Sequence, residues 1–243
     1  RGIVHIQVEL WKSQRNLQLL EMIKAGKILE RGLHPISARE EWWYPLYVKE
    51  LCPGLPDWRA LRGCSSLFQR EGSEGFGVLW TGHWLDTYAN LIRALNLNFV
   101  IIRVSSDQEI WLKLSDALAQ KRPIVINNWS PNWTDELIEG EFVEFPAYEP
   151  ECETNPEWGA SPAISFDCGN PKHVDVSKMV WSGLPELSPC ADRLVAAMEF
   201  NPSMIVDAAR LQVVENLEER QAALKWSEIY YEPLTRWLKQ SCD

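Results

Sequence analysis

Short apolar runs alternate with amphipathic segments through the middle of the chain. Three runs are largely apolar, which predicts buried strands: Phe76–Trp80, Phe99–Val104, which is apolar except for Arg103, and Ile124–Asn127. Between them, Leu85–Leu95 and Ser106–Gln120 have the period of a helix, and Ser105 or Ser106 can cap the second. Strands and helices that alternate in this way predict a βαβ series, and therefore a parallel sheet in an α/β lobe.

The segments on either side of this series have weaker patterns. Ile3–Leu10 alternates loosely and is predicted to be a strand, whereas Asn16–Arg31 has a helical period that ends at Gly32. Glu41–Val48 is aromatic and β-prone, and Glu141–Phe145 is a further strand candidate. These segments predict that the βαβ series is flanked by further secondary structure on both sides.

The last third of the chain begins with a stretch that has no period. Ala147–Pro171 is rich in Pro, Glu, Gly and Cys, which predicts a long loop. The remainder is predicted to be helical, with Pro233 breaking the last of these segments: Ala191–Phe200, Pro202–Val213 and Leu217–Leu238.

Tryptophan recurs where apolar runs end. Three apolar runs end in or near tryptophans: the first at Trp11, the second at Trp80 and Trp84, and the third at Trp129 and Trp133. A strand that ends in a turn holds its side chains at a rigid edge, where a binding residue is most useful. Three strand ends could therefore build a box of aromatic faces. The alternative, which the sequence leaves open, is that these rings cap a hydrophobic core.

Charge and cysteine content narrow the class of protein. The net charge is −10, which argues against a nucleic-acid-binding surface, and no apolar run approaches the ~20 residues of a membrane span. The chain starts at Arg1, so we expect a mature or trimmed product. Six cysteines fall as Cys52/Cys64, Cys152/Cys168 and Cys190/Cys242, and none shows CxxC spacing. We therefore expect disulfides in an oxidising compartment, with local pairing of the first two of these couples; the alternative is six reduced cysteines in a cytosolic chain.

Catalytic and metal-binding motifs are missing from the sequence. The four histidines form no HxH or HExxH pair, and GxSxG, P-loop and GxGxxG motifs do not occur. Acidic pairs such as Glu151 with Glu153 lie on polar stretches that are typical of a solvated face. We therefore expect no enzyme, no metal and no cofactor.

The indole pattern and the proline turn together resemble a known family. The stretch Lys121–Trp133 is close to K-x-P-V-(apolar/aromatic)₃-W-T-P-x-W, a motif of the substrate-binding proteins of glycine betaine/proline betaine (osmoprotectant) ABC importers. Val8–Ser13, Phe76–Asp86 and Trp43–Val48 are also similar to that family, and the resemblance covers about Ile3 to Leu238.

The resemblance implies a fold and a domain organisation. We expect an α/β, two-lobed periplasmic-binding-protein fold of type II, a venus flytrap whose hinge crossovers lie near residues 48–52 and 169–174. One lobe would comprise residues 1–50 plus 171–243, and the other residues 51–170. Family members usually carry a further N-terminal βαβ unit, which we expect to be missing here, either because the chain is trimmed or because this branch has lost the unit.

The resemblance also implies a binding site for a quaternary ammonium group. Such a group carries charge but no N–H, so the electron-rich face of an indole is its best partner. Position by position, the family's aromatic box falls on Trp11, Trp84 and Trp129. A carboxylate on the ligand would be held by further groups, namely the guanidinium of Arg15, the backbone N–H groups of Leu85 and Asp86, and the amide of Asn132.

Several other residues are secondary candidates. Trp80 and Trp133 either form a fourth wall or pack beneath the box, and His83 could hydrogen-bond a ligand. Trp43 and Tyr44 line the cleft or belong to the core, and Trp158 is a rival member of the box on a loop. Four more indoles are expected in the core: Trp111, Trp181, Trp226 and Trp237.

These features predict a non-catalytic, monomeric binding protein in the periplasm or outside the cell. It would hold a betaine-like quaternary ammonium compound and deliver it to an ABC permease. Two alternatives stay open, which are a sensory ectodomain of the same fold acting on a receptor, and a binder of sugars or other cations. The sequence does not choose among glycine betaine, proline betaine, choline, carnitine and their analogues.

Overall fold

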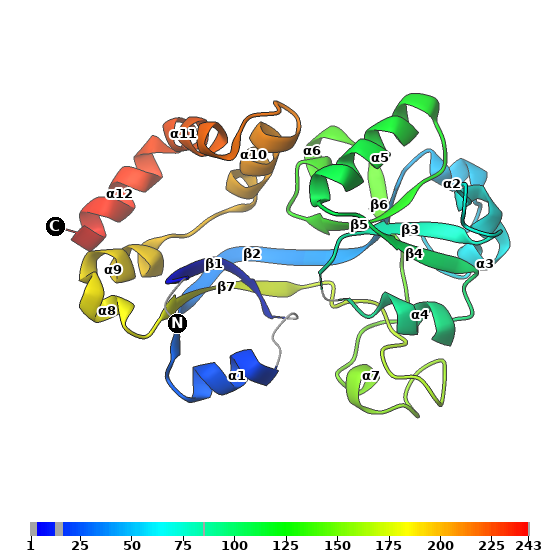
Figure 1. Cartoon of the computed structure of the whole chain (residues 1–243), viewed down its shortest axis with the longest axis horizontal. Coiled ribbons are helices and arrows are strands. Elements are labelled where there is room, and N and C mark those ends of the chain that lie inside the picture. The colour runs from blue at the N-terminus through cyan, green and yellow to red at the C-terminus, as the bar shows by residue number, and fades with distance from the viewer. Residues whose placement is uncertain (1–3, 13–16, 85, 243) are drawn as a thin grey trace. The chain divides into compact units, whose positions relative to one another are not determined.

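A computed structural model describes residues 4–12, 17–84 and 86–242, and it divides the chain into two compact units. Unit 1 contains the residues up to Ala38, the short segment Pro131–Trp133 and the residues from His173 onward. Unit 2 contains Arg39–Ser130 and Thr134–Lys172. The strand β2 (Ile28–Pro45) runs through the boundary, so its first half belongs to unit 1 and its second half to unit 2 (Figure 1). The lobe boundaries and hinge positions expected from the sequence stay predictions.

The sheet of unit 2 is mixed. The strands β3 (Gly77–Thr81), β4 (Phe99–Arg103) and β5 (Val125–Ser130) are parallel, with β3 between the other two. The second half of β2 pairs antiparallel with β5 and with the short β6 (Gly140–Phe142). The predicted βαβ series is therefore correct, and the antiparallel neighbour β2 is an addition to it.

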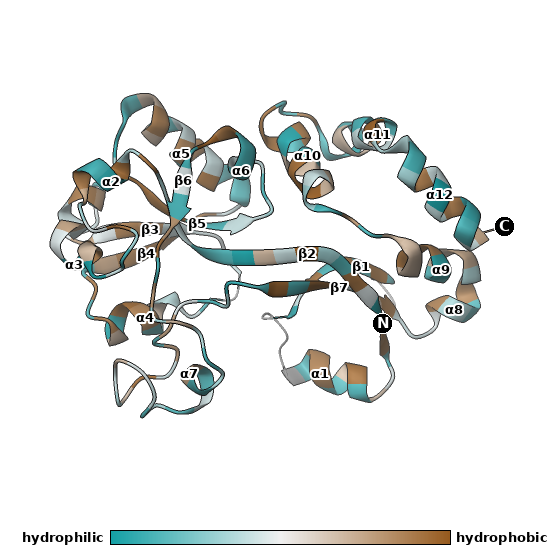
Figure 2. Cartoon of the chain, turned by 180° about the vertical axis from the view of Figure 1, so that it is seen from behind, coloured by the Kyte–Doolittle hydropathy of each residue, from teal (hydrophilic) through white to brown (hydrophobic). Residues whose placement is uncertain are grey.

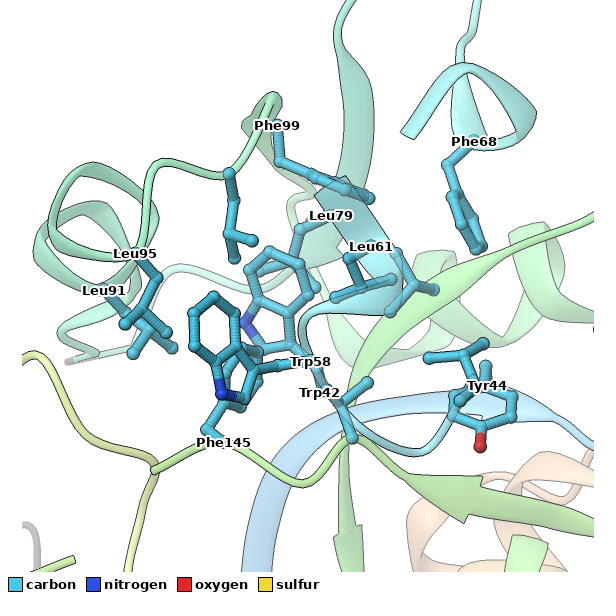
Figure 3. Close-up of a cluster of buried hydrophobic side chains, with 14 of the residues drawn as sticks. Trp42, Tyr44, Trp58, Leu61, Phe68, Leu79, Leu91, Leu95, Phe99 and Phe145 are labelled. Carbon is cyan, nitrogen blue, oxygen red and sulfur yellow. The ribbon is translucent and has the colours of Figure 1, made fainter. Parts of the chain in front are cut away.

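The helices of unit 2 cover this sheet and enclose one hydrophobic core. They are α2 (Val48–Leu51), α3 (Ala60–Cys64), the 3₁₀ helix η2 (Ser65–Phe68), α4 (Tyr88–Ala94), α5 (Asp107–Gln120), α6 (Thr134–Leu137) and α7 (Glu151–Thr154). Ser106 caps α5 by accepting the backbone N–H of Glu109, as the sequence predicts. Figure 3 shows the core, in which Trp42 lies among side chains such as Trp58, Leu79 and Phe99.

Two disulfides lie in unit 2. Cys52–Cys64 joins α2 to α3, and Cys152–Cys168 closes the long loop that follows β6. Both local pairings predicted from the sequence are confirmed. Because a disulfide restricts the unfolded chain, the second bridge stabilises a segment that otherwise holds only the single helical turn α7.

Unit 1 contains an antiparallel sheet. The strand β7 (Val174–Trp181) lies between β1 (Ile6–Trp11) and the first half of β2. Its side chains at Val174, Val176 and Val180 are buried. The prediction of helices for this region is wrong, because a central strand buried on both faces lacks the strict polar–apolar alternation of a half-exposed one.

The first part of β2 is a second correction. The predicted helix Asn16–Arg31 is shorter in the structure, where α1 spans Leu17–Lys24 and β2 begins at Ile28. Gly26 has a φ of 66°, a left-handed conformation that ends a helix at no steric cost for glycine. The residues Ile28–Glu30 then pair with β7 instead of continuing the helix.

The remaining helices of unit 1 form its C-terminal part. They are α8 (Leu184–Leu187), α9 (Pro189–Ala197), α10 (Pro202–Val213), α11 (Glu219–Ile229) and α12 (Tyr231–Cys242). The last predicted helix is broken between Ile229 and Tyr231, with Pro233 in the first turn of α12. Most of α12 is polar in Figure 2. The helix packs against α9, and the disulfide Cys190–Cys242 links the two covalently.

Trp181 is a third correction. Its indole was predicted to lie in the core, but 39% of the residue is exposed. The ring lies against Gly183 and makes an edge contact with His5 at 5.6 Å. With neighbouring side chains of β1, α1 and β7 it borders an apolar cavity of about 490 Å³ within unit 1.

Candidate ligand-binding site

Three parallel strands of unit 2 end at the same edge of the sheet. The register pairs Thr81 of β3 with Arg103 of β4, and β5 runs on to Ser130. Ligands of open α/β sheets bind at the carboxyl ends of their strands, where loop residues converge. The side chains that follow these three strand ends are therefore the first candidates for a site.

Two of the predicted indoles meet at this edge. The rings of Trp84 and Trp129 have centroids 6.0 Å apart and planes at 90° to each other. Both residues are half-buried, and Trp129 lies within β5 instead of in the turn that the sequence suggested. The two rings form an edge-to-face pair, which we call the aromatic corner.

A third indole packs against Trp129. Trp111 of α5 lies with its ring centroid 5.3 Å from that of Trp129, at an angle of 58°. Only 3% of Trp111 is exposed, so the prediction that it is a core residue is correct. Its contact with the ring of Trp129, which restricts the movement of that ring, was not predicted.

Glu40 is a carboxylate that the sequence analysis did not single out. In the antiparallel pairing of β2 with β5, Glu40 lies directly opposite Trp129. Opposite residues in such a pair point to the same face of the sheet with Cβ atoms about 5 Å apart. The structure therefore places a carboxylate next to the aromatic corner.

A buried hydrogen-bond network orients this carboxylate. Asn127 donates to Glu40 Oε1 at 2.7 Å and accepts from the Tyr88 hydroxyl at 2.7 Å. The side-chain amide of Asn170 donates to the Tyr88 hydroxyl at 3.2 Å and to the backbone carbonyl of Glu40 at 2.9 Å. Burial raises the pKa of Tyr88 well above its usual range, so this hydroxyl stays a donor.

The neighbouring Glu41 points to the opposite face and is buried. Its carboxyl oxygens accept the backbone N–H groups of Trp42 at 3.0 Å and Asn170 at 2.8 Å. Burial raises the pKa of Glu41 to about 8, although both hydrogen bonds act in the other direction. Glu41 therefore joins β2 to the segment around Asn170, and it is not part of the aromatic corner.

Asp86 is paired within unit 2. Arg103 donates to its two carboxylate oxygens at 2.6 and 3.2 Å, and the backbone N–H of Tyr88 donates to it at 3.2 Å. Only 4% of the Asp86 side chain is exposed. The N–H of Tyr88 at the start of α4 is therefore used by the protein's own carboxylate.

The secondary candidates of unit 2 divide between packing and surface positions. Lys113 lies over the ring of Trp80 at 5.1 Å, so one face of this indole already carries a cation. Trp43 is buried against Gly140, and Tyr44 is fully buried with its hydroxyl donating to Glu141. Two other candidates lie at the surface or near it: His83, which is exposed, and Trp158, which is half-buried in the loop closed by Cys152–Cys168.

The other predicted site residues lie in unit 1 or outside the described ranges. Trp11 ends β1 opposite Val176, is buried, and donates its indole N–H to Glu9 at 3.0 Å. Asn132 and Trp133 are buried, and the Asn132 side chain accepts the backbone N–H of Trp133. Arg15 and Leu85 fall outside the described residues.

The site is suited to recognising a cation without N–H donors. Two indole faces attract positive charge through their quadrupoles, and a carboxylate stands beside them. Within the described ranges, no group of three or more His, Cys, Asp or Glu side chains could hold a metal ion. None of the helices in the described part of the chain is both long and apolar enough to cross a membrane.

Comparison with known families agrees with this chemistry. Residues 1–228 match the family described as the substrate binding domain of ABC-type glycine betaine transport system. The chain belongs to this family. The resemblance noted in the sequence is therefore confirmed, as is the expectation of a non-catalytic binding protein, since the family binds substrates for ABC transporters.

Individual members of the family differ in their ligands. A trimethylamine N-oxide-binding protein from Pelagibacter ubique (strain HTCC1062) is 31% identical over 237 residues, which are 93% of this chain and 72% of that protein. Among solved structures, the choline-binding protein of an ABC transporter in complex with choline aligns with a TM-score of 0.70 and 13% identity. That alignment covers 98% of this chain and 75% of the other.

A second solved structure, lactococcal OpuAC complexed with glycine betaine, aligns with a TM-score of 0.62 and 17% identity, covering 98% of this chain and 81% of the other. At these identities, the two solved structures establish the fold. The α/β fold of periplasmic binding proteins is therefore confirmed for this chain.

Proposed function

We propose that this protein binds a small compound with a trimethylated nitrogen at Trp84 and Trp129, and delivers it to the permease of an ABC transporter. The observation that carries the proposal is the right-angled indole pair with Glu40 opposite Trp129. A trimethylated nitrogen has positive charge and an apolar surface, so indole faces and a nearby carboxylate match both properties.

The charges around the corner favour ligands that lack a carboxylate. Glu40 and Asp86 are both acidic, and the nearby Arg103 already donates to Asp86 and to the carbonyl of Gly82. A ligand carboxylate would therefore approach two acidic groups and a guanidinium that is already engaged. Within the betaine-like class predicted from the sequence, we expect choline and trimethylamine N-oxide to bind more tightly than glycine betaine.

The location of the protein follows from its cysteines and from its family. Three disulfides suit an oxidising compartment, and an importer's binding protein meets its ligand outside the inner membrane. We infer a periplasmic or extracellular location. The contributions of Trp11, Arg15 and Leu85 to ligand binding stay predictions.

Calorimetric titration with trimethylamine N-oxide, choline, glycine betaine and a panel of sugars and amino acids tests the proposal. We expect micromolar or tighter binding of at least one methylated compound, and loss of that binding in Trp84→Ala and in Trp129→Ala. Phe166→Ala, a change of a half-buried aromatic residue in the loop closed by Cys152–Cys168, is the control. Binding of sugars or amino acids with no response to any methylated compound would overturn the proposal.

A further inference from the structure

The side chain of Arg103 connects both sides of the segment that carries Trp84. Arg103 is the last residue of β4, and its Nη1 donates to the backbone carbonyl of Gly82 at 2.9 Å. The same guanidinium donates to both carboxylate oxygens of Asp86. Gly82 lies two residues before Trp84, and Asp86 lies two residues after it. One planar guanidinium therefore holds the backbone carbonyl of Gly82 before the indole and the side chain of Asp86 after it.

The ring of Trp84 lies directly on the backbone of Gly82. A Cβ atom built at Gly82 would overlap the six-membered ring of Trp84, so no other residue type fits there without moving the indole. The indole N–H of Trp84 is buried and has no hydrogen-bond partner among the described residues. The orientation of this ring therefore depends on its contacts with Gly82 and Trp129, and not on a hydrogen bond of its own.

We infer that Arg103 is a positioning residue, which holds Trp84 at a right angle to Trp129 through its bonds to Gly82 and Asp86. The inference rests on the proposed function, because it assigns to Arg103 the geometry of the corner that would receive the ligand. Arg103 does not act as a ligand-binding group in this account, since its donors are already directed at Gly82 and Asp86.

The experiment compares Arg103→Met with the wild-type protein by two readouts. The first is the Kd for choline and trimethylamine N-oxide, which we expect to rise roughly tenfold, within the range for coupled neighbouring residues. The second needs no ligand: neighbouring indoles can give an exciton couplet in circular dichroism, the difference between wild type and Trp84→Phe identifies the part that Trp84 contributes, and we expect this part to weaken. Arg103→Lys should restore part of both signals, because an ammonium can still donate to one of the two partners.

A double-variant cycle separates positioning from general stability. If Arg103 acts through Trp84, then Arg103→Met should weaken binding much less in a Trp84→Phe background than in the wild type. Arg93→Met is the matched control, since Arg93 is an exposed arginine of the same unit whose side chain donates to Asn90. Should Arg103→Met fail to fold, the pair Arg103→Met/Asp86→Asn avoids leaving a buried carboxylate uncompensated.

The outcomes distinguish this inference from the proposed function. An unchanged couplet in a folded Arg103→Met variant overturns the inference, whether or not any ligand binds. The inference is also overturned if Arg103→Met weakens binding as much in the Trp84→Phe background as in the wild type. If the wild type binds no methylated compound, the proposed function fails, while a weakened couplet still supports the positioning of Trp84 by Arg103.

Discussion

Replacing Glu40 by Gln should weaken the binding of cations selectively. Gln keeps the shape of the side chain and an oxygen that can accept from Asn127, so the polar network beneath the corner has a partner in the variant. What the substitution removes is the negative charge opposite Trp129. The change therefore tests the role of that charge and leaves the indoles in place.

The magnitude follows from the geometry of the sheet. An ammonium nitrogen on an indole face lies within about 6 Å of the ring centroid, and one on the side of Trp129 that faces Glu40 would lie at roughly the same distance from the carboxylate. At about 6 Å and an effective dielectric constant of about 20, two unit charges interact with roughly 3 kcal/mol. Glu40 and Trp129 are half-buried, and screening by water and salt reduces this to about 1–2 kcal/mol, or roughly a 5- to 30-fold increase in Kd.

The assay is calorimetric titration of both proteins with choline and with 3,3-dimethyl-1-butanol, which replaces the ammonium nitrogen by carbon. Glu40→Gln should raise the Kd for choline roughly 5- to 30-fold and leave the Kd for the neutral alcohol unchanged. Glu149→Gln, at an exposed position of unit 2, controls for the change in net charge. Equal losses for the two ligands, or no loss for choline, would refute the reasoning.

Three further predictions concern the loop at Trp84, the buried Glu41 and the third disulfide. Gly82→Ala should displace the Trp84 ring and weaken ligand binding, measured by titration, while the melting temperature changes little; unchanged affinity would show that the ring's pose is not needed. Burial raises the pKa of Glu41 to about 8 from 4.5, so the folded state binds this proton more tightly than the unfolded state. The free energy of unfolding should therefore fall as the pH rises from about 5 to about 8, and Glu41→Gln should remove this slope in denaturant titrations at a series of pH values. Cys190→Ser/Cys242→Ser should lower the free energy of unfolding by about 4 kcal/mol, because the bridge closes a separation of 52 residues; a loss below 1 kcal/mol, measured by chemical denaturation, would contradict this.

The sequence predicts the central part of unit 2 well. Local signals suffice there, because β3, β4 and β5 are short apolar runs separated by periodic helices, and Ser106 is a standard helix cap. The first part of β2 and all of β7 were missed. Their residues are held by pairing with one another across a long separation in sequence, which no local pattern reports.

The candidate site shows the same limit. Trp84 and Trp129 could be singled out because tryptophan recurs at the ends of apolar runs, and the structure brings these two rings together. Glu40 could not be identified from the sequence, because its position opposite Trp129 depends on the antiparallel pairing of β2 with β5. Arg103 did give a signal, as the one charged residue of an apolar strand, but its bond to Asp86 appears only in the fold.

The charge selectivity of the corner tests the central claim most directly. The measurement is the ratio of the Kd values of wild-type protein for 3,3-dimethyl-1-butanol and for choline, at low and at moderate salt. If indole faces and Glu40 recognise a positive charge, choline should bind at least about tenfold more tightly, and the difference should shrink as salt is added. Equal affinities for the two ligands would mean that the corner recognises shape alone, and would contradict the account.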